Sequence, residues 1–334
     1  MTAKENNKSG SINRRIVLQS GAALGLLSMT RPIWAQTVSE PVVLITGTST
    51  GFGRLMAEGF AKNGARVIAT MRDLNGKNAA AAQELRSLAG FATPIEVVEI
   101  DVLSDESVAA GVARAMESAG RIDIVVSNAG IVVPGPVELQ PPMAFVSNID
   151  TNLGGALRLY RAVVPHMRAQ GSGTIIQMSS ALGRAIDPML GGYCASKLAV
   201  EAAADALGYE VAASNIEVAV AQPAGAYPTQ LQANAIRYWE RMLTTLNETD
   251  RVKLKTYAPH IEAMLTDLAP DTALDPREVS DAVIALAATK FGTRPGRLTV
   301  GPYRDGIDPV NAAHEQLQND MISHNRIADL LMLK

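Results

Sequence analysis

Tyr193 and Lys197 have the residue types and the spacing that proton transfer needs. Side chains four residues apart on a helix lie on one face, one turn from each other. A phenol with a pKa of about 10 is a poor acid at neutral pH, and a nearby ammonium lowers that pKa. We therefore predict that Tyr193 exchanges a proton with a carbonyl or alcohol, and we note Ser180 thirteen residues upstream. Taken alone, the spacing also fits an ordinary pair of surface side chains.

A strand, a glycine turn and a helix are predicted one after another near the start of the chain. Residues 41–46 form a short apolar, β-branched run typical of a buried strand, and residues 54–61 have a helical pattern. Between them the glycines have the spacing Gly-x-x-x-Gly-x-Gly, where backbone can approach a pyrophosphate closely at a helix N-terminus. This context predicts a dinucleotide site rather than a mere tight turn. Its predicted cofactor contacts are Gly47, Thr48, Ser49, Gly51, Phe52 and Gly53.

Short apolar runs alternate with helical patterns along the rest of the chain. The further predicted strands cover residues 67–70, 95–100, 122–127, 174–178, 216–221 and 298–300. Such alternation predicts a parallel sheet with helices on both faces, that is, a single Rossmann-type doubly wound α/β domain. In such folds ligands bind at the carboxyl edge of the sheet, so residues that directly follow the strands should gather there.

Composition limits the function classes. The chain has 334 residues, and 47% of them are hydrophobic, which is enough for one sizeable core. Its net charge of −3 gives no sign of a basic surface that would bind nucleic acid. The four histidines lack the spacing of metal ligands, so we expect no metal. Cys194 is the only cysteine, which excludes an intramolecular disulfide. Since adjacent helix residues do not share a face, Cys194 is expected to pack beside Tyr193 rather than act as a thiol nucleophile.

These motifs together resemble those of the classical short-chain dehydrogenases/reductases (SDR). The glycine turn, Asn128-Ala129-Gly130 after a predicted strand, Ser180 and the Tyr193–Lys197 pair occur in the family's order, over roughly residues 40–305. The resemblance implies that the catalytic residues are Asn152, Ser180, Tyr193 and Lys197. It adds cofactor contacts at Asp101, Val102, Asn128, Ala129, Gly130, Tyr193, Lys197, Pro223 and Thr229. Ala224 separates Pro223 from Gly225 where the family has Pro-Gly, which leaves the roles of Pro223 and Thr229 open.

The resemblance also implies a mechanism. An NAD(P)-dependent oxidoreductase of this family interconverts a carbonyl and an alcohol by hydride transfer. Tyr193 would give the proton, and Lys197 would lower the pKa of Tyr193 and bind the nicotinamide ribose. Ser180 would donate to the substrate oxygen, and Asn152 would hold a water that links Lys197 to solvent.

The choice between NADP and NAD depends on the end of the second strand. By the family's spacing its tip falls on Met71, and Arg72 follows. A guanidinium there can bind a 2′-phosphate in bidentate fashion, whereas a carboxylate would repel it. We therefore favour NADP, although the neighbouring Asp73 keeps NAD open.

The first 35 residues precede the predicted domain. Arg14-Arg15 is followed by an uncharged stretch over 16–30, and Ala35 is the small residue near which we expect cleavage. Together these features resemble a twin-arginine export signal. We expect residues 1–35 to be cleaved and the twin-arginine machinery to deliver the protein to the periplasm. The alternatives are a disordered extension on a cytoplasmic protein and an uncleaved membrane tether. Residues 36–310 would then form the NAD(P)-binding domain, with a substrate lid at about 227–275, and residues 311–334 a helical extension.

The predicted lid is rich in apolar side chains. We expect an apolar ketone, aldehyde or secondary alcohol as substrate, hydroxysteroid-like, retinoid-like or acyl-like. Predicted lining residues are Val133, Met143, Met189, Leu190, Tyr227, Leu231, Ile236, Tyr238, Trp239, Met242 and Leu243. Packing of the lid onto the body explains the same residues equally well. Family members are often dimers or tetramers, so a homo-oligomer is expected. The alternatives are a non-catalytic NADP-binding sensor or scaffold, and an epimerase or dehydratase of the family's extended branch.

Overall fold

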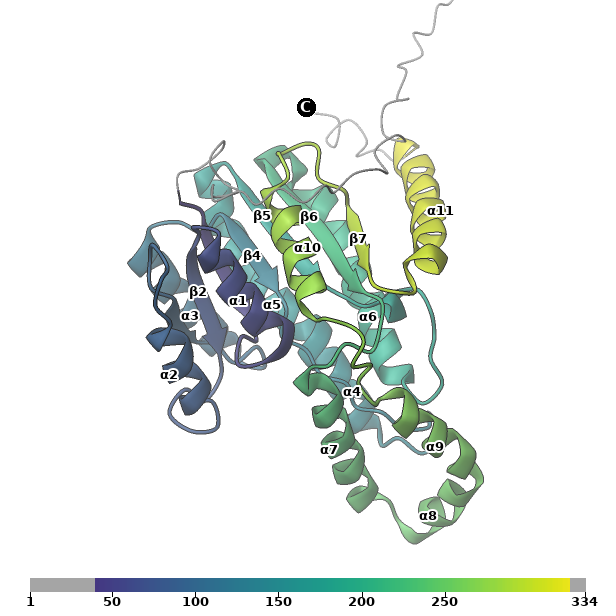
Figure 1. Cartoon of the computed structure of the whole chain (residues 1–334). Helices are drawn as coiled ribbons and strands as arrows, with labels where there is room; N and C mark the ends of the chain where they lie inside the picture. Colours follow the sequence, from purple (N-terminus) through teal and green to yellow (C-terminus); the bar gives the residue numbers. More distant parts are fainter. Residues whose placement is uncertain (1–39, 325–334) are drawn as a thin grey trace, which may run out of the picture. The chain divides into compact units, whose positions relative to one another are not determined.

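The computed structural model describes residues 40–324, and the predicted export signal lies outside that range. One sheet of seven parallel strands has the order β3-β2-β1-β4-β5-β6-β7 (Figure 1). The strands are β1 (Val42–Thr46), β2 (Arg66–Met71), β3 (Glu96–Glu99), β4 (Ile124–Ser127), β5 (Gly173–Met178), β6 (Ile216–Pro223) and β7 (Arg297–Val300). The predicted doubly wound parallel sheet is thereby confirmed.

Helices cover both faces of this sheet. The α-helices are α1 (Gly51–Lys62), α2 (Ala79–Ser87), α3 (Asp105–Ala119), α4 (Pro142–Ile149), α5 (Gly155–Gln170), α6 (Gly191–Val211), α7 (Gln230–Thr245), α8 (Glu248–Leu254), α9 (Ala258–Asp267), α10 (Arg277–Ala288) and α11 (Arg304–Ser323). Short helices of other types are η1 (Asp150–Gly154), η2 (Ala181–Gly183), η3 (Ala212–Ser214) and η4 (Lys255–Tyr257).

The alternation of side chains along the strands explains the two layers. In β1, Val43 and Ile45 point into the core that α1 and α10 cover. Val42 and Leu44 point into the opposite core, which α3, α5 and α6 cover. Successive strand side chains point to opposite faces, so a strand that is apolar at every position must be buried on both sides.

The order of the strands places a switch point between β1 and β4. From β1 the chain passes outward through β2 to β3 and then returns to place β4 on the other side of β1. The register pairs Ile45 with Val126, so both strands end side by side, just before Gly47 and Asn128. Ligands bind at such a point because the loops after the two strands lead away from each other.

Helices α7, α8 and α9 fill the stretch where the lid was expected, and Figure 1 shows them projecting together beyond the sheet. Trp239 and Met242 of α7 pack with Met189 and with Met264 of α9 in one buried cluster. Of the other predicted lining residues, Met143 on α4 is 76% exposed, and Tyr227 is buried in the core beside α1. Within the described residues, no helix is both long and apolar enough to cross a membrane.

Candidate active site

The glycine turn after β1 is shaped by close contacts that only glycine permits. Gly47 and Gly51 have φ angles of +72° and +59°, in the left-handed region where side chains are strained. A Cβ at Gly53 would lie 2.2 Å from the carbonyl oxygen of Gly47. The N-cap residue Thr50 makes no side-chain capping bond, which leaves the N–H groups of the first turn of α1 for an anion. The turn therefore fits a phosphate-bearing cofactor.

Thr46 and Asn128 lock this turn onto the end of β4. The hydroxyl of Thr46 accepts hydrogen bonds from the backbone N–H groups of Asn128 and Ala129, at 2.9 and 3.0 Å. The amide of Asn128 donates to the carbonyl oxygens of Thr46 and Gly47, at 2.8 and 3.2 Å. The side chain of Asn128, a predicted cofactor contact, is thus occupied in holding the turn.

Other predicted cofactor residues lie around the same edge of the sheet. Thr48 is buried and donates through its N–H and its hydroxyl to the carbonyl oxygen of Thr70. Asp101 follows β3, and its carboxylate accepts from the N–H of Leu103 at 3.1 Å. Val102 packs against Gly155, where a Cβ would lie 2.9 Å from the Val102 side chain.

The start of α7 approaches the glycine turn. Thr229 is the N-cap of α7, and a Cβ at Gly51 would lie 3.4 Å from its side chain. The rings of Phe52 and Tyr227 meet edge to face, with centroids 5.6 Å apart. Pro223 ends β6. The roles of Pro223 and Thr229 toward a cofactor stay predictions.

Ser180 and Tyr193 meet at the carboxyl end of β5. The side chain of Ser180 hydrogen-bonds the phenol of Tyr193. The Ser180 oxygen also accepts from the N–H of Leu182 at 3.1 Å, which leaves its own proton available to donate to the phenol. Burial raises the pKa of Tyr193 to about 12, against the lowering effect of Ser180.

The raised pKa is opposite to the lowering expected from Lys197. The Lys197 ammonium lies 5.6 Å from the centroid of the Tyr193 ring and donates to the carbonyl oxygen of Met178 at 3.0 Å. Burial lowers the pKa of Lys197 to about 8, while the carboxylate of Glu201 opposes that shift. The spacing in sequence indicated a shared helix face correctly, but it could not show that desolvation of both groups outweighs their attraction.

Asn152 joins this pair through the backbone. It lies in the π-helix η1, a local widening between α4 and α5 of the kind often found at functional sites. Its oxygen accepts from the N–H of Ile131 at 2.8 Å, and its amide donates to the Ile131 carbonyl at 3.0 Å. The same amide donates to the hydroxyl of Ser196 at 2.8 Å, and Ser196 donates to the carbonyl oxygen of Tyr193 at 2.7 Å. All four predicted catalytic residues therefore belong to one connected site.

Gly130 borders the same site. A Cβ there would lie 3.0 Å from the Asn152 oxygen and 3.8 Å from the Lys197 nitrogen. Sequence reasoning missed Ser196 and Glu201, although both lie on the face of α6 that holds Tyr193 and Lys197. Their spacings of three and four residues from these side chains were the available signal.

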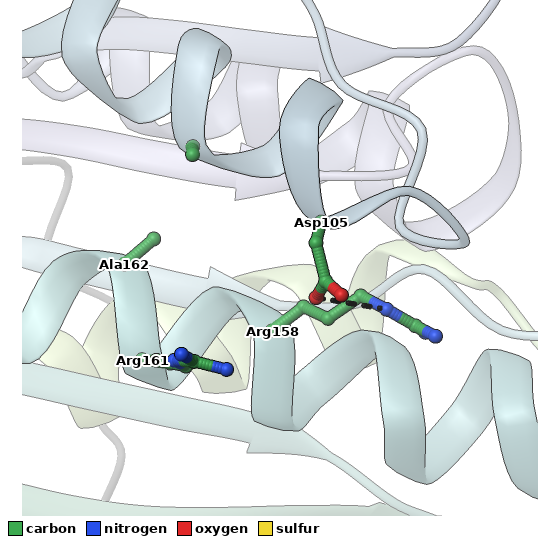
Figure 2. Close-up of a pocket in the computed structure, with 5 residues that line it drawn as sticks. Asp105, Arg158, Arg161 and Ala162 are labelled. Atoms are coloured by element: carbon green, nitrogen blue, oxygen red, sulfur yellow. Dashed lines mark ion pairs between the residues drawn. The ribbon is translucent and has the colours of Figure 1, made fainter.

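A cavity of about 350 Å³ lies away from this site, between α3 and α5 (Figure 2). Asp105 of α3 and Arg158 of α5 form an ion pair of 3.3 Å at its edge. No predicted site residue lines it; the lining residues are Asp105, Ala109, Arg158, Arg161 and Ala162. Within residues 40–324, no group of three or more His, Cys, Asp or Glu side chains could hold a metal ion.

Comparisons with known proteins agree with this geometry. Human 17-beta-hydroxysteroid dehydrogenase type 1 is 31% identical over 262 residues, which are 76% of this chain and 76% of that protein. Retinol dehydrogenase 7 of Rattus norvegicus is 30% identical over 246 residues, 71% of this chain and 75% of that protein. The crystal structure of 3-ketoacyl-(acyl-carrier-protein) reductase from Brucella melitensis, complexed with NADH, aligns with a TM-score of 0.62 and 27% identity, covering 79% of this chain and 98% of that one. The family model described as short chain dehydrogenase matches residues 41–238. The chain belongs to the short-chain dehydrogenase/reductase family and is an oxidoreductase of that family.

Proposed function

We propose that this protein is an NAD(P)-dependent oxidoreductase that interconverts a carbonyl and an alcohol by hydride transfer. One observation supports it above all: a buried phenol, Tyr193, hydrogen-bonded to Ser180 and one helical turn from a buried lysine. The dehydrogenase and reductase relatives support the same reaction class. A sensor or scaffold would not need this complete arrangement.

Each residue of the proposed site has its own role in the reaction. A nicotinamide dinucleotide with its pyrophosphate at the glycine turn would supply or accept the hydride. Tyr193 is protonated at neutral pH, because its pKa is about 12, and gives its proton to the substrate oxygen during reduction. Ser180 donates a hydrogen bond to the same oxygen and orients it. Lys197 binds the nicotinamide ribose, and its charge favours release of the Tyr193 proton.

We propose NADP(H) as the preferred cofactor. The backbone of Asp73 is left-handed, with φ +53°, and its carboxylate accepts from the N–H of Lys77 at 2.8 Å. A carboxylate turned into its own loop is not directed at an adenosine ribose. Arg72 is exposed beside it, and among the described residues no carboxylate pairs with Arg72. Its guanidinium is therefore available for a 2′-phosphate.

We propose an apolar ketone, aldehyde or secondary alcohol as substrate. Tyr193 shares a buried cluster with Leu231 and Ala235 of α7. The adjoining cluster contains Trp239 and Met242 from the same helix. A pocket formed by opening α7 from the body would be apolar around the phenol. The hydroxysteroid and retinol dehydrogenase relatives support this substrate class.

Two further proposals concern the protein's surroundings. We propose a homo-oligomer, which the exposed apolar side chains of Leu103, before α3, and Leu157 of α5 support, since they are 41% and 45% exposed and a second copy could bury them. Arg14-Arg15 and the uncharged stretch after it support export to the periplasm.

A turnover assay tests the proposed function. Oxidation of NADPH and of NADH is followed with a panel of aldehydes, quinones, steroid ketones and β-keto esters. We expect turnover with an apolar carbonyl and a preference for NADPH. Failure to bind either nucleotide would refute the proposal, and tight binding without turnover on any carbonyl would favour the sensor.

A further inference from the structure

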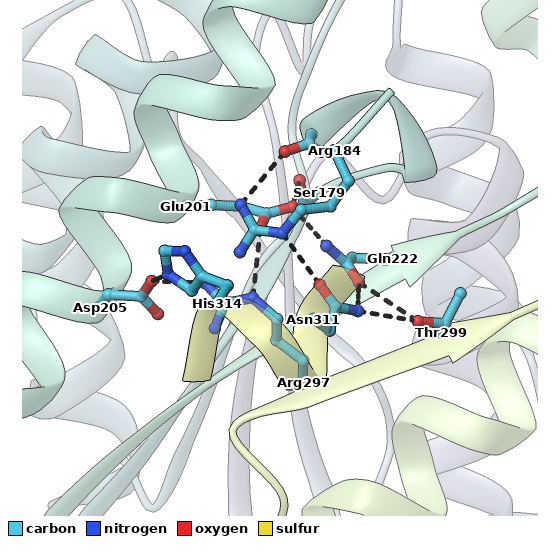
Figure 3. Close-up of polar contacts among 10 residues, drawn as sticks. Ser179, Arg184, Glu201, Asp205, Gln222, Arg297, Thr299, Asn311 and His314 are labelled. Atoms are coloured by element: carbon cyan, nitrogen blue, oxygen red, sulfur yellow. Dashed lines mark hydrogen bonds and ion pairs between the residues drawn. The ribbon is translucent and has the colours of Figure 1, made fainter. Parts of the chain in front are cut away.

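A buried polar network lies one helical turn beyond Lys197, where α6 meets β5, β6 and β7 (Figure 3). Its centre is Glu201 of α6, which is 0% exposed. The carboxylate oxygen Oε1 accepts hydrogen bonds from the hydroxyl of Ser179 at 2.6 Å and from the amide of Gln222 at 2.8 Å. A buried carboxylate is tolerated only where such partners replace its water.

Both hydrogen-bond donors stand next to residues of the proposed active site. Ser179 directly precedes Ser180, and Gln222 directly precedes Pro223. The ends of their strands are also joined by the backbone, since the N–H of Ser179 donates to the carbonyl of Ala221 at 2.7 Å. One carboxylate on α6 therefore fixes the ends of β5 and β6 against the helix that holds Tyr193 and Lys197.

Two arginines neutralise the carboxylate from the other side. Arg184 and Arg297 approach its oxygen Oε2 at 3.0 and 3.4 Å. Arg297 also pairs with Asp205, which in turn lies 3.3 Å from His314. Arg184, which follows η2, and Arg297 of β7 are the cations that contact Glu201, and Asp205 of α6 and His314 of α11 extend the network beyond Arg297.

The helix α11 closes the network through Asn311. The Asn311 oxygen accepts from Arg184 at 2.9 Å, and its amide donates to Gln222 at 2.7 Å and to Thr299 at 3.3 Å. Every polar partner of Glu201 is thus held in place by a further bond or a neighbouring element. Hydrogen bonds and ion pairs from several elements thus hold the central carboxylate in one position.

We infer that Glu201 is a positioning residue for the reaction: its carboxylate fixes the strand ends that present Ser180 and Pro223, and its charge supports the ammonium of Lys197. The inference rests on the proposed function for the reaction itself. Glu201 and Lys197 are four residues apart on α6, so their side chains share a face. Burial lowers the pKa of Lys197 to about 8, and the Glu201 carboxylate prevents a larger fall. Without that carboxylate, Arg184 would lose its ion pair, Arg297 would keep only Asp205, and Lys197 would lose the charge that opposes the fall of its pKa.

The pKa of Lys197 can be measured without substrate or cofactor. Full-length protein labelled with ¹³C at the lysine Cε is titrated by NMR, and Lys197→Met identifies the resonance. In Glu201→Gln the pKa of Lys197 should fall by about one unit. Glu210→Gln removes an exposed carboxylate from the same helix and is the matched control, which should leave that pKa within about 0.2 units.

Kinetics of two Glu201 variants separate the effect of the carboxylate's position from the effect of its charge. Glu201→Asp keeps the charge but withdraws it from Ser179 and Gln222, so kcat should fall about fivefold to tenfold while the pKa of Lys197 changes little. Glu201→Gln should also move the alkaline limb of the pH–rate profile to lower pH, whereas a purely structural defect would lower kcat equally at every pH. An unchanged lysine pKa in folded Glu201→Gln, or an unchanged kcat in Glu201→Asp, overturns the inference. Wild-type protein without carbonyl turnover would instead refute the proposed function, and the lysine titration would still decide the charge effect of Glu201.

Discussion

The side-chain amide of Asn152 donates a hydrogen bond of 2.8 Å to the hydroxyl of Ser196, which joins the π-helix η1 directly to α6. Ser196 passes the connection on by donating to the carbonyl oxygen of Tyr193. Asn152 is also hydrogen-bonded to the backbone of Ile131, in the loop after β4. Asn152 and Ser196 therefore link this loop to α6, the helix of the proposed proton donor. The position of Tyr193 therefore depends on a serine that makes no contact with the reacting atoms.

Ser196→Ala should weaken the connection between η1 and α6, because it removes the hydroxyl that bonds Asn152 and the Tyr193 carbonyl. The variant leaves a buried amide of Asn152 short of one partner, so the free energy of unfolding should fall by about 1–3 kcal/mol. We also expect kcat to fall several-fold while nucleotide affinity stays within about twofold of wild type, because the glycine turn is untouched. Urea unfolding and steady-state kinetics measure the two effects.

Ser147→Ala is the matched control for this change. The Ser147 hydroxyl donates only to the Ala144 carbonyl within its own helix, at 2.7 Å. Its removal should change stability by less than about 0.5 kcal/mol. Equal effects of the two substitutions would contradict the role of Ser196.

Gly53→Ala should damage the cofactor site. Its Cβ would lie 2.2 Å from the Gly47 carbonyl and 2.5 Å from the Asn128 amide, so the turn must move. We expect nucleotide affinity to fall by more than about tenfold, measured by fluorescence titration, since backbone at such a turn approaches the pyrophosphate closely. Gly306→Ala in α11, where a Cβ meets nothing within 4 Å, should bind like wild type. Undiminished affinity in Gly53→Ala would show that the nucleotide does not use this turn.

Arg72→Ser tests the cofactor preference. The substitution removes the guanidinium proposed to hold the 2′-phosphate, so the Kd of NADPH should rise by about tenfold or more and that of NADH should hardly change. Arg114→Ser removes an exposed arginine whose partner is Glu117 on the same helix, and serves as a control for net charge. A parallel loss of affinity for both nucleotides would argue against a 2′-phosphate contact.

The pH dependence should follow Lys197. Burial lowers its pKa to about 8, so the ammonium is present below that pH and is lost as the pH rises through it. Tyr193, with a pKa of about 12, stays protonated over the same range. For carbonyl reduction, kcat/KM reports the free enzyme, so it should decline above pH ~8 by up to tenfold per unit. A profile that is flat to pH 10 would contradict a requirement for charged Lys197.

The fold could be predicted from the sequence because strands, tight turns and helix faces each leave a local pattern of residues. Apolar runs followed by glycines predict a strand and a tight turn, and the Tyr193–Lys197 spacing predicts a shared helix face. Neither the desolvation that raises the Tyr193 pKa nor the hydrogen bond from Ser180 could be estimated in that way. Both depend on how deeply separate segments are packed.

The network around Glu201 could not be predicted from local sequence patterns either. Its partners Ser179 and Arg297 come from segments 22 and 96 residues away in sequence. A single glutamate on a helix gives no sign of such partners. The turn of the Asp73 carboxylate into its own loop likewise depends on one left-handed residue, which the sequence did not indicate.

Tyr193→Phe tests the central claim most directly. It removes one oxygen, the proposed proton donor, and keeps the ring that packs beside Leu231. Turnover of the best carbonyl substrate and the Kd of NADPH are measured for wild type, for Tyr193→Phe, and for Tyr209→Phe, which makes the same change elsewhere on α6. We predict that Tyr193→Phe lowers kcat by about 10²–10⁴-fold while NADPH binding persists, and that Tyr209→Phe stays active. Full activity in Tyr193→Phe would show that another group supplies the proton.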